Sequence, residues 1–158
     1  MYRILPVLVF LAASGCGDGK PGIEHAGPSS SQYSNSTDIG ADPVAVVRRY
    51  YEAIRNRQYD SAYALWERSG EASGQTRAEF ASGFSKTEQT IASMGDSVHI
   101  EGAAGSQYAS VPVIIDATLR GGTRQHFTGT YTLRRAMVDG ATPEQRSWHI
   151  YSAHLQQH

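Results

Sequence analysis

Asp116 is the residue of this sequence best placed to act as a catalytic base. It is the only acidic residue in the middle of a strand-like segment, "VIIDATL". A carboxylate buried on one face of a sheet has a raised pKa, as general-base catalysis near neutral pH requires. A hydroxyl that donates to developing negative charge could come from Tyr51, Tyr63 or Tyr131. Such a carboxylate and hydroxyl together could move a proton and stabilise the negative charge that develops.

The same residues also have an interpretation without chemistry. Asp116 could lie on the solvent-facing side of its strand and pair with a neighbouring arginine such as Arg134. Aromatic residues at helical spacing usually pack into a core. The inward positions of the first predicted helix hold Val47, Tyr51 and Ile54, and none of these is an acidic residue or a histidine. The sequence therefore favours an interior without paired acid–base groups.

The histidines do not form a metal-binding motif. No His-x-His spacing occurs among the six of them, and Cys16 is the only cysteine. His149 and His154 are expected on opposite faces of one strand, because side chains alternate along a strand. His126 and His154 could share a metal only if adjacent strands aligned them. We therefore predict neither a metal site nor a cofactor.

The amino-terminal residues have the pattern of an export signal. In "MYRILPVLVFLAASGC", Arg3 precedes an apolar run of roughly ten residues, which is too short to span a bilayer but typical of a signal peptide. The alternative is a buried amino-terminal helix or strand. The ending "ASGC" resembles the lipobox of bacterial lipoproteins. The resemblance implies that residues 1–15 are removed and that Cys16 carries acyl chains such as palmitate, which anchor it to a membrane.

Residues 16–41 are predicted to tether this lipidated cysteine to a folded domain. Gly, Pro, Ser and Asn dominate the segment after Cys16, so it cannot bury enough surface to offset the entropy lost on ordering. By resemblance to lipoprotein sorting rules, Gly17 implies delivery to the outer membrane, facing the periplasm. The net charge of −1 argues against nucleic-acid binding, which needs clustered Lys and Arg.

The folded region is predicted to begin with an amphipathic helix. Asp42 suits the N-cap position and Pro43 the first helical position. Apolar residues then recur at helical spacing as Val44, Val47, Tyr51 and Ile54. This helix should end near residues 56–58.

Two shorter helices are predicted next. Asp60 is expected to cap the first of them, which carries Tyr59, Tyr63 and Trp66 at helical spacing. Thr76 and Glu79 form a capping-box pattern ahead of the second, which carries Phe80 and Phe84.

The remaining residues predict an antiparallel sheet of about four strands. The segments with strand-like patterns are 98–101, 107–119, 123–138 and 147–155. Gly121 and Gly122 lie between the second and third of these segments. Both permit the positive φ angles of a two-residue hairpin turn.

The order of these elements resembles one fold family. The stretch "VVRRYYEAIRNRQYDSAYALW", residues 46–66, is similar to the opening of NTF2-like (SnoaL-like) domains. The resemblance covers residues 42–158. It implies an α+β fold in which three amino-terminal helices pack against a curved antiparallel sheet, forming a cone or half-barrel with a conical pocket. The residues expected to line this pocket are Val47, Tyr51, Ile54, Tyr63, Trp66, Phe80, Phe127, Tyr131 and Trp148.

The fold family does not by itself decide the function, because its members include isomerases, dehydratases, secretion-system subunits and binding modules. Our first hypothesis is a membrane-anchored envelope lipoprotein whose domain binds a protein partner or a small apolar ligand without catalysis. One alternative is an isomerase- or hydratase-like enzyme with Asp116 as the base. Another is an accessory lipoprotein of a secretion system or of a toxin–immunity pair. The family's open sheet face also makes a homodimer plausible.

Overall fold

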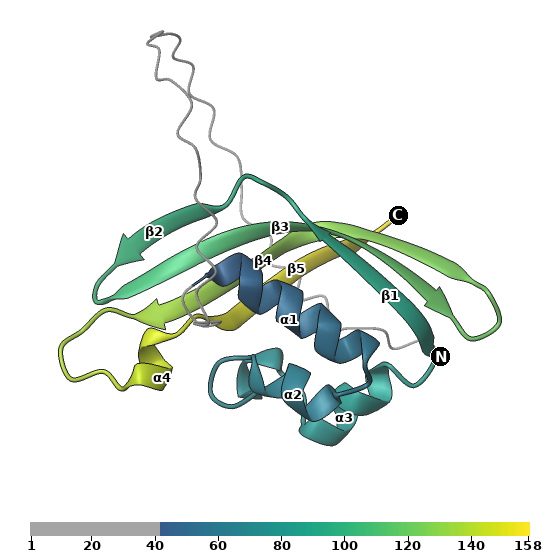
Figure 1. Cartoon of the computed structure of the whole chain (residues 1–158), viewed down its shortest axis with the longest axis horizontal. Helices are drawn as coiled ribbons and strands as arrows, with labels where there is room; N and C mark the ends of the chain where they lie inside the picture. The colour runs from purple at the N-terminus through teal and green to yellow at the C-terminus, as the bar shows by residue number, and fades with distance from the viewer. Residues whose placement is uncertain (1–41) are drawn as a thin grey trace, which may run out of the picture.

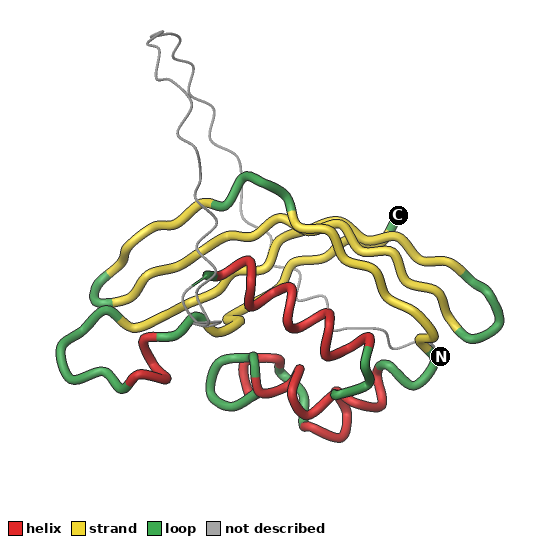
Figure 2. Tube along the Cα trace, viewed as in Figure 1, coloured by secondary structure: helices red, strands yellow, loops and turns green. Residues whose placement is uncertain are grey.

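The computed structural model describes residues 42–158, which form a helical layer on one side of a curved antiparallel sheet (Figure 1). The helical layer lies against one face of the sheet, and the sheet stays open rather than closing into a barrel (Figure 2). This is the predicted α+β architecture. The predicted signal peptide, tether and lipid-bearing Cys16 lie outside the described residues. Within residues 42–158, no helix is long and apolar enough to cross a membrane.

The first helix, α1 (Pro43–Arg55), begins and ends where the sequence predicts. Asp42 accepts a hydrogen bond from the backbone N–H of Val44 at 2.9 Å, so its side chain caps the helix. Pro43 occupies the first turn, where its missing N–H costs no helical hydrogen bond. The buried side of α1 is wider than the predicted stripe, and its residues are Pro43, Val46, Val47, Tyr50, Tyr51, Ala53 and Ile54.

The rest of the helical layer consists of two short helices and a 3-10 turn: α2 (Tyr59–Ala64), η1 (Glu71–Ser73) and α3 (Arg77–Gly83). The predicted capping box of α3 is present, with reciprocal hydrogen bonds between Thr76 and Glu79. The predicted cap of α2 is wrong. Helix α2 begins before Asp60, which lies in its first turn and pairs with Arg77 at 3.3 Å.

Five antiparallel strands form one sheet: β1 (Thr87–Met94), β2 (His99–Ala103), β3 (Ser106–Leu119), β4 (Arg124–Ala136) and β5 (His149–Gln157). Their order is β1-β3-β4-β5, and β2 pairs with the part of β3 that β1 leaves free. The sequence does not predict β1, because Thr90 is the only fully buried residue of the strand. The short helix α4 (Pro143–Arg146) before β5 is also unpredicted.

The β3–β4 hairpin has a longer loop than the predicted two-residue turn. Gly121 and Gly122 do have positive φ angles, of 106° and 85°. However, the backbone N–H of Leu119 donates to the carbonyl of Thr123 at 2.8 Å, so residues 120–122 form the loop. A difference of one residue in loop length shifts every cross-strand pair of the hairpin.

A bulge in β5 changes the direction in which its histidines point. Tyr151 is an extra residue of β5 that has no pairing partner on β4. His149 and His154 pair with Arg134 and Thr130, which are an even number of residues apart on β4. Both histidines therefore lie on the same face of the sheet, and the prediction of opposite faces is wrong.

The hydrophobic core lies between α1 and the sheet. We call the sheet face that packs against α1 the inner face and the opposite face the outer face. The buried residues of the inner face include Ala109, Val111, Val113, Ile115, Tyr131, Leu133 and Ile150. The segment after α2 extends the sheet at β5, where Glu67 N–H donates to Ile150 and Ile150 N–H donates to Leu65. These two hydrogen bonds tie the helical layer to the edge of the sheet.

Candidate functional site

Three tyrosine hydroxyl groups lie in the interior between α1 and the sheet, and we call these residues the tyrosine cluster. Tyr50 and Tyr51 come from the buried side of α1, and Tyr131 comes from the inner face of β4. The hydroxyl oxygens of Tyr51 and Tyr131 are 2.7 Å apart and share a buried hydrogen bond. The ring of Tyr131 contacts those of Tyr50 and Tyr51 at centroid distances of 5.8 and 6.0 Å.

Burial raises the pKa of all three hydroxyls well above the ordinary tyrosine value. A charge on one hydroxyl would also repel a charge on its neighbour, which raises the pKa further. The cluster therefore stays protonated around neutral pH. Its hydroxyls can donate hydrogen bonds, but none of them is available as a base.

Other aromatic side chains close the interior around the tyrosine cluster. Trp66 lies edge-on to Tyr50 and Tyr131, at centroid distances of 6.2 and 6.3 Å. Phe80 of α3 contacts Tyr50 at 6.3 Å. The indole Nε1 of Trp66 is buried and has no hydrogen-bond partner among the described residues. Burial and then the neighbouring Tyr131 raise the pKa of Tyr50, whereas the nearby Trp66 indole lowers it, although Nε1 of Trp66 lies outside hydrogen-bonding geometry.

The interior contains no carboxylate or imidazole from residues 42–158. Every Asp, Glu and His side chain in this range is exposed, except Glu67 and His149, which are half-buried. The buried polar residues, tyrosines aside, are Thr90 and Ser106. General acid–base catalysis needs a group that takes up a proton near neutral pH within hydrogen-bond reach of the substrate. The tyrosine cluster supplies no such group.

The residues predicted to line a pocket are packed into the core. All nine belong to the hydrophobic cluster or pack against it, and Phe127 alone is half-buried. One small depression, lined in part by Ile54, Tyr59 and Phe84, has a volume of about 10 Å³, hardly enough for one water molecule. A second, open depression of about 610 Å³ lies beside α2 and α3. The residues lining these two depressions do not include the tyrosine cluster.

Asp116 lies on the outer face of the sheet and not in the interior. Its side chain is 64% exposed, and its Oδ1 is 2.8 Å from Nδ1 of His126, its cross-strand neighbour on β4. From this position it cannot reach the tyrosine cluster, so it does not fit the role of an interior base. The expected pairing of Asp116 with Arg134 is also wrong, because Arg134 pairs with Glu67.

Similarity to known proteins is found in structure alone. No family model matches the sequence, and no curated protein matches it either. A candidate scytalone dehydratase from Novosphingobium aromaticivorans matches with a TM-score of 0.52 and 10% identity, over 72% of this chain and 79% of its own. A candidate aromatic ring hydroxylase from the same species matches with a TM-score of 0.50 and 14% identity, over 70% and 82%. An NTF2-like superfamily protein from Salmonella enterica matches with a TM-score of 0.48 and 16% identity, over 70% and 84%.

The fold is NTF2-like. Helices α1 to α3 followed by an open, curved antiparallel sheet are the arrangement that the sequence resemblance implies. At these identities the likeness establishes the fold alone, and the activities for which the matched proteins are named remain statements about those proteins.

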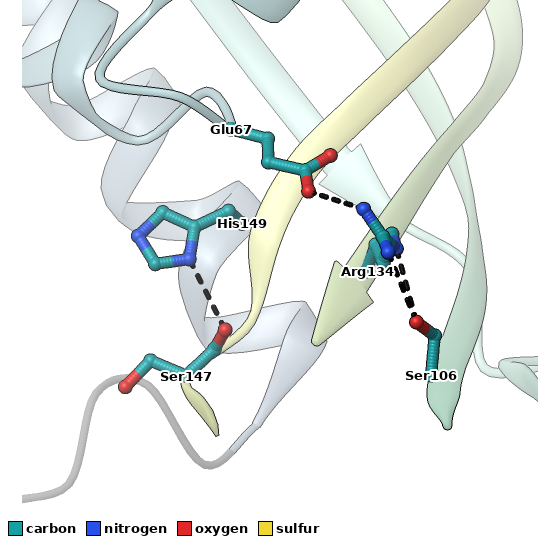
Figure 3. Close-up of polar contacts among 5 residues, drawn as sticks. All are labelled: Glu67, Ser106, Arg134, Ser147 and His149. Atoms are coloured by element: carbon teal, nitrogen blue, oxygen red, sulfur yellow. Dashed lines mark hydrogen bonds and ion pairs between the residues drawn. The ribbon is translucent and has the colours of Figure 1, made fainter. Parts of the chain in front are cut away.

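A polar network on the outer face of the NTF2-like domain joins the segment after α2 to the sheet (Figure 3). Arg134 Nη1 donates to Glu67 Oε1 at 2.6 Å, and Arg134 Nε and Nη2 donate to Ser106 Oγ at 3.2 and 3.1 Å. The guanidinium also lies over the ring of Tyr108, 5.9 Å from its centroid. Sequence reasoning missed this network, because Glu67 is far from its partners along the chain.

The NTF2-like domain does not bring together His126 and His154, the two histidines that the sequence suggested could share a metal. His154 pairs with Thr130 on β4, so the strands do not bring it beside His126. The neighbour of His126 is His158, whose backbone N–H donates to the carbonyl of His126 at 3.0 Å. Among residues 42–158, no group of three or more His, Cys, Asp or Glu side chains is arranged to hold a metal ion.

Proposed function

We propose that this chain is a membrane-anchored envelope lipoprotein whose NTF2-like domain binds a protein partner or a small apolar ligand and catalyses no reaction. The observation that supports a non-catalytic role is the make-up of the interior. The interior holds the hydroxyl groups of the tyrosine cluster, whereas the acidic and histidine side chains of residues 42–158 lie outside it. A domain with this interior can recognise a molecule by shape and hydrogen bonding without transferring a proton.

A protein partner is the better supported of the two binding roles. A ligand enclosed in the cone would have to displace packed aromatic side chains, since the core residues around the tyrosine cluster are already in contact. The surface offers larger areas. The open depression beside α2 and α3 is lined by Tyr63, Arg68, Gln75 and Arg77 among others, and the outer face exposes Ile91 and Ile114.

Membrane anchoring is proposed from the lipobox-like "ASGC" and the single cysteine. Cys16→Ser should move the protein from the membrane fraction of cells to the soluble fraction. Ser14→Ala is the matched control, because it keeps a small residue ahead of the cysteine and should leave the protein in the membrane fraction. Density-gradient separation of the two membranes would test the outer-membrane location. Unchanged membrane association of Cys16→Ser would contradict the anchor.

Partner binding can be tested by site-specific photo-crosslinking in cells. A crosslinking residue would replace Gln75 in the open depression, Ile114 on the outer face, or Arg49 on the exposed side of α1. We expect an adduct of defined mass at Gln75 or Ile114 and none at Arg49, and mass spectrometry would show whether the partner is another protein or a second copy of this chain. A small molecule retained in native mass spectrometry, without any adduct, would favour the ligand role. The absence of both would contradict binding.

The enzyme alternative would have to operate without Asp116 in the interior. Of the residues considered for catalysis, Tyr51 and Tyr131 are the two whose hydroxyls meet there. Turnover of any substrate that is lost in Tyr131→Phe and kept in Asp116→Asn would support an enzyme built on the tyrosine cluster and would overturn our proposal.

A further inference from the structure

A second group of chemically capable side chains lies on the outer face, at the end of the sheet where β3, β4 and β5 run side by side. Asp116 of β3 and His126 of β4 are cross-strand partners, and His158 follows β5 beside His126. The rings of the two histidines have centroids 6.0 Å apart and planes inclined by 53°. All three side chains are accessible to solvent, so an ion could reach them without any opening of the fold.

The hydrogen bond to Asp116 fixes which nitrogen of His126 is free. A carboxylate only accepts hydrogen bonds, so the proton shared over the 2.8 Å contact must be on Nδ1 of His126. In the neutral ring this leaves the lone pair on Nε2. Histidines that bind metal ions are commonly held in this way, with the second ring nitrogen donating to a carboxylate that orients the ring and makes it more basic.

His158 is held at a suitable distance to supply a second nitrogen. Its Nε2 is 2.8 Å from Thr128 Oγ1, and when Nε2 donates in this bond the lone pair of the ring is on Nδ1. A metal–nitrogen bond of about 2.0–2.1 Å places an imidazole centroid about 3.2 Å from the ion. Two rings on one ion therefore have centroids between about 4.5 Å apart, for bonds at about 90°, and about 6.4 Å apart, for bonds at about 180°. The observed 6.0 Å separation fits this range with little movement of two exposed rings.

We propose that His126 and His158 form a two-histidine site for a divalent transition-metal ion, with Cu²⁺ bound most tightly. Imidazole nitrogen suits copper, nickel and zinc, and affinities for such sites rise towards copper along the first-row series. Water molecules complete the coordination, since only two protein ligands are present. Asp116 is a positioning residue, because it holds His126 in the required tautomer without touching the ion.

The chain contains its own control for this site. His99 also lies near a carboxylate, 3.9 Å from Glu101, and both side chains are exposed. Its cross-strand partner on β3, however, is Ser110 and not a second histidine. A site that depends on two imidazoles should therefore be lost with His126 or His158 and unaffected by loss of His99.

The test is Cu²⁺ titration of the untagged full chain, by calorimetry and by electron paramagnetic resonance. The wild type should bind one Cu²⁺ saturably, with coupling to two nitrogens. His126→Ala and His158→Ala should each lose this binding, and His99→Ala should keep it. Asp116→Asn should bind about tenfold more weakly, and ¹⁵N chemical shifts should show that His126 no longer favours the Nδ1–H tautomer.

Two results would overturn the proposal. One is the absence of saturable Cu²⁺ binding by the wild type. The other is binding that survives both His126→Ala and His158→Ala, which would place the ion elsewhere. Because both histidines are exposed at the end of the sheet, neither substitution should prevent folding. Unchanged Cu²⁺ affinity in Asp116→Asn would refute the positioning role of this carboxylate.

Discussion

The inner and outer faces of the sheet differ in the kind of chemistry that their side chains allow. The inner face is enclosed and aromatic, and it contains the buried hydrogen bond of the tyrosine cluster. The outer face is open, and it holds Asp116 and His126 at 2.8 Å together with the polar network of Arg134. The enclosed environment is therefore on the inner face of these strands, whereas the acid–base groups are on the outer face.

The proposal of a non-catalytic role depends on this separation. An enzyme active site excludes water from the groups that transfer protons, because hydrogen bonds and charges act more strongly in a dry environment. Here the carboxylate and imidazole side chains of residues 42–158 lie outside the dry interior, on surfaces that water reaches. Substitutions that alter one face and leave the other unchanged are therefore the most informative tests of the structure.

The largest effect is expected from an isoleucine pair on β3. Ile115 is 4% exposed on the inner face, whereas its neighbour Ile114 is 49% exposed on the outer face. Ile115→Ala should lower the free energy of unfolding by about 2–5 kcal/mol, because it leaves a cavity in the core. Ile114→Ala should change it by only about 0.5 kcal/mol. Chemical denaturation of both variants measures the difference, and equal losses would contradict the placement of the two side chains on opposite faces of β3.

The next largest effect concerns the buried hydroxyl pair. Tyr51→Phe or Tyr131→Phe removes one partner of the 2.7 Å hydrogen bond and leaves the other hydroxyl buried. Each single variant should lose about 1–3 kcal/mol of stability. The stability lost in the double variant should be less than the sum of the two single losses, because neither hydroxyl of the pair remains buried without its partner. A double-mutant cycle by denaturation tests this, and strictly additive losses would mean that the hydroxyls do not interact.

Alkaline pH should destabilise the protein through the same cluster. The folded-state pKa values of Tyr50, Tyr51 and Tyr131 are raised above the ordinary value. The unfolded chain therefore loses these protons first, from about pH 10, and the stabilisation, complete below that pH, is lost as pH rises towards the folded-state values. Each tyrosine contributes a slope of about 1.4 kcal/mol per pH unit. The Tyr51→Phe/Tyr131→Phe variant should have the shallower slope in denaturation curves measured above pH 10, and an unchanged slope would contradict the assignment.

Local signals in the sequence predicted much of this architecture. The Asp42 cap, the Thr76–Glu79 capping box and the buried side of α1 depend on residues close together in the chain. Strand β1 gave no comparable signal. Its alternation is weak because it lies at the edge of the sheet and leaves most of its side chains partly exposed.

The pairing of Asp116 could not be predicted, because it depends on the register of the β3–β4 hairpin. A two-residue turn at Gly121 and Gly122 would place Asp116 opposite Phe127. The loop instead includes one more residue, and Asp116 lies opposite His126. One loop residue therefore decides whether this carboxylate faces an aromatic ring or an imidazole.

The smallest predicted effect compares two ion pairs that differ in exposure. Glu67 and Arg134 pair at 2.6 Å with side chains 24% and 37% exposed, whereas Asp60 and Arg77 pair at 3.3 Å with side chains 74% and 60% exposed. Glu67→Gln should cost about 1 kcal/mol of stability, because Arg134 keeps Ser106 and Tyr108 but loses its charged acceptor. Asp60→Asn should cost less than about 0.5 kcal/mol, since water screens an exposed pair. Denaturation at low and high salt measures both costs, and a greater loss from Asp60→Asn would contradict the idea that the outer-face network holds the helical layer to the sheet.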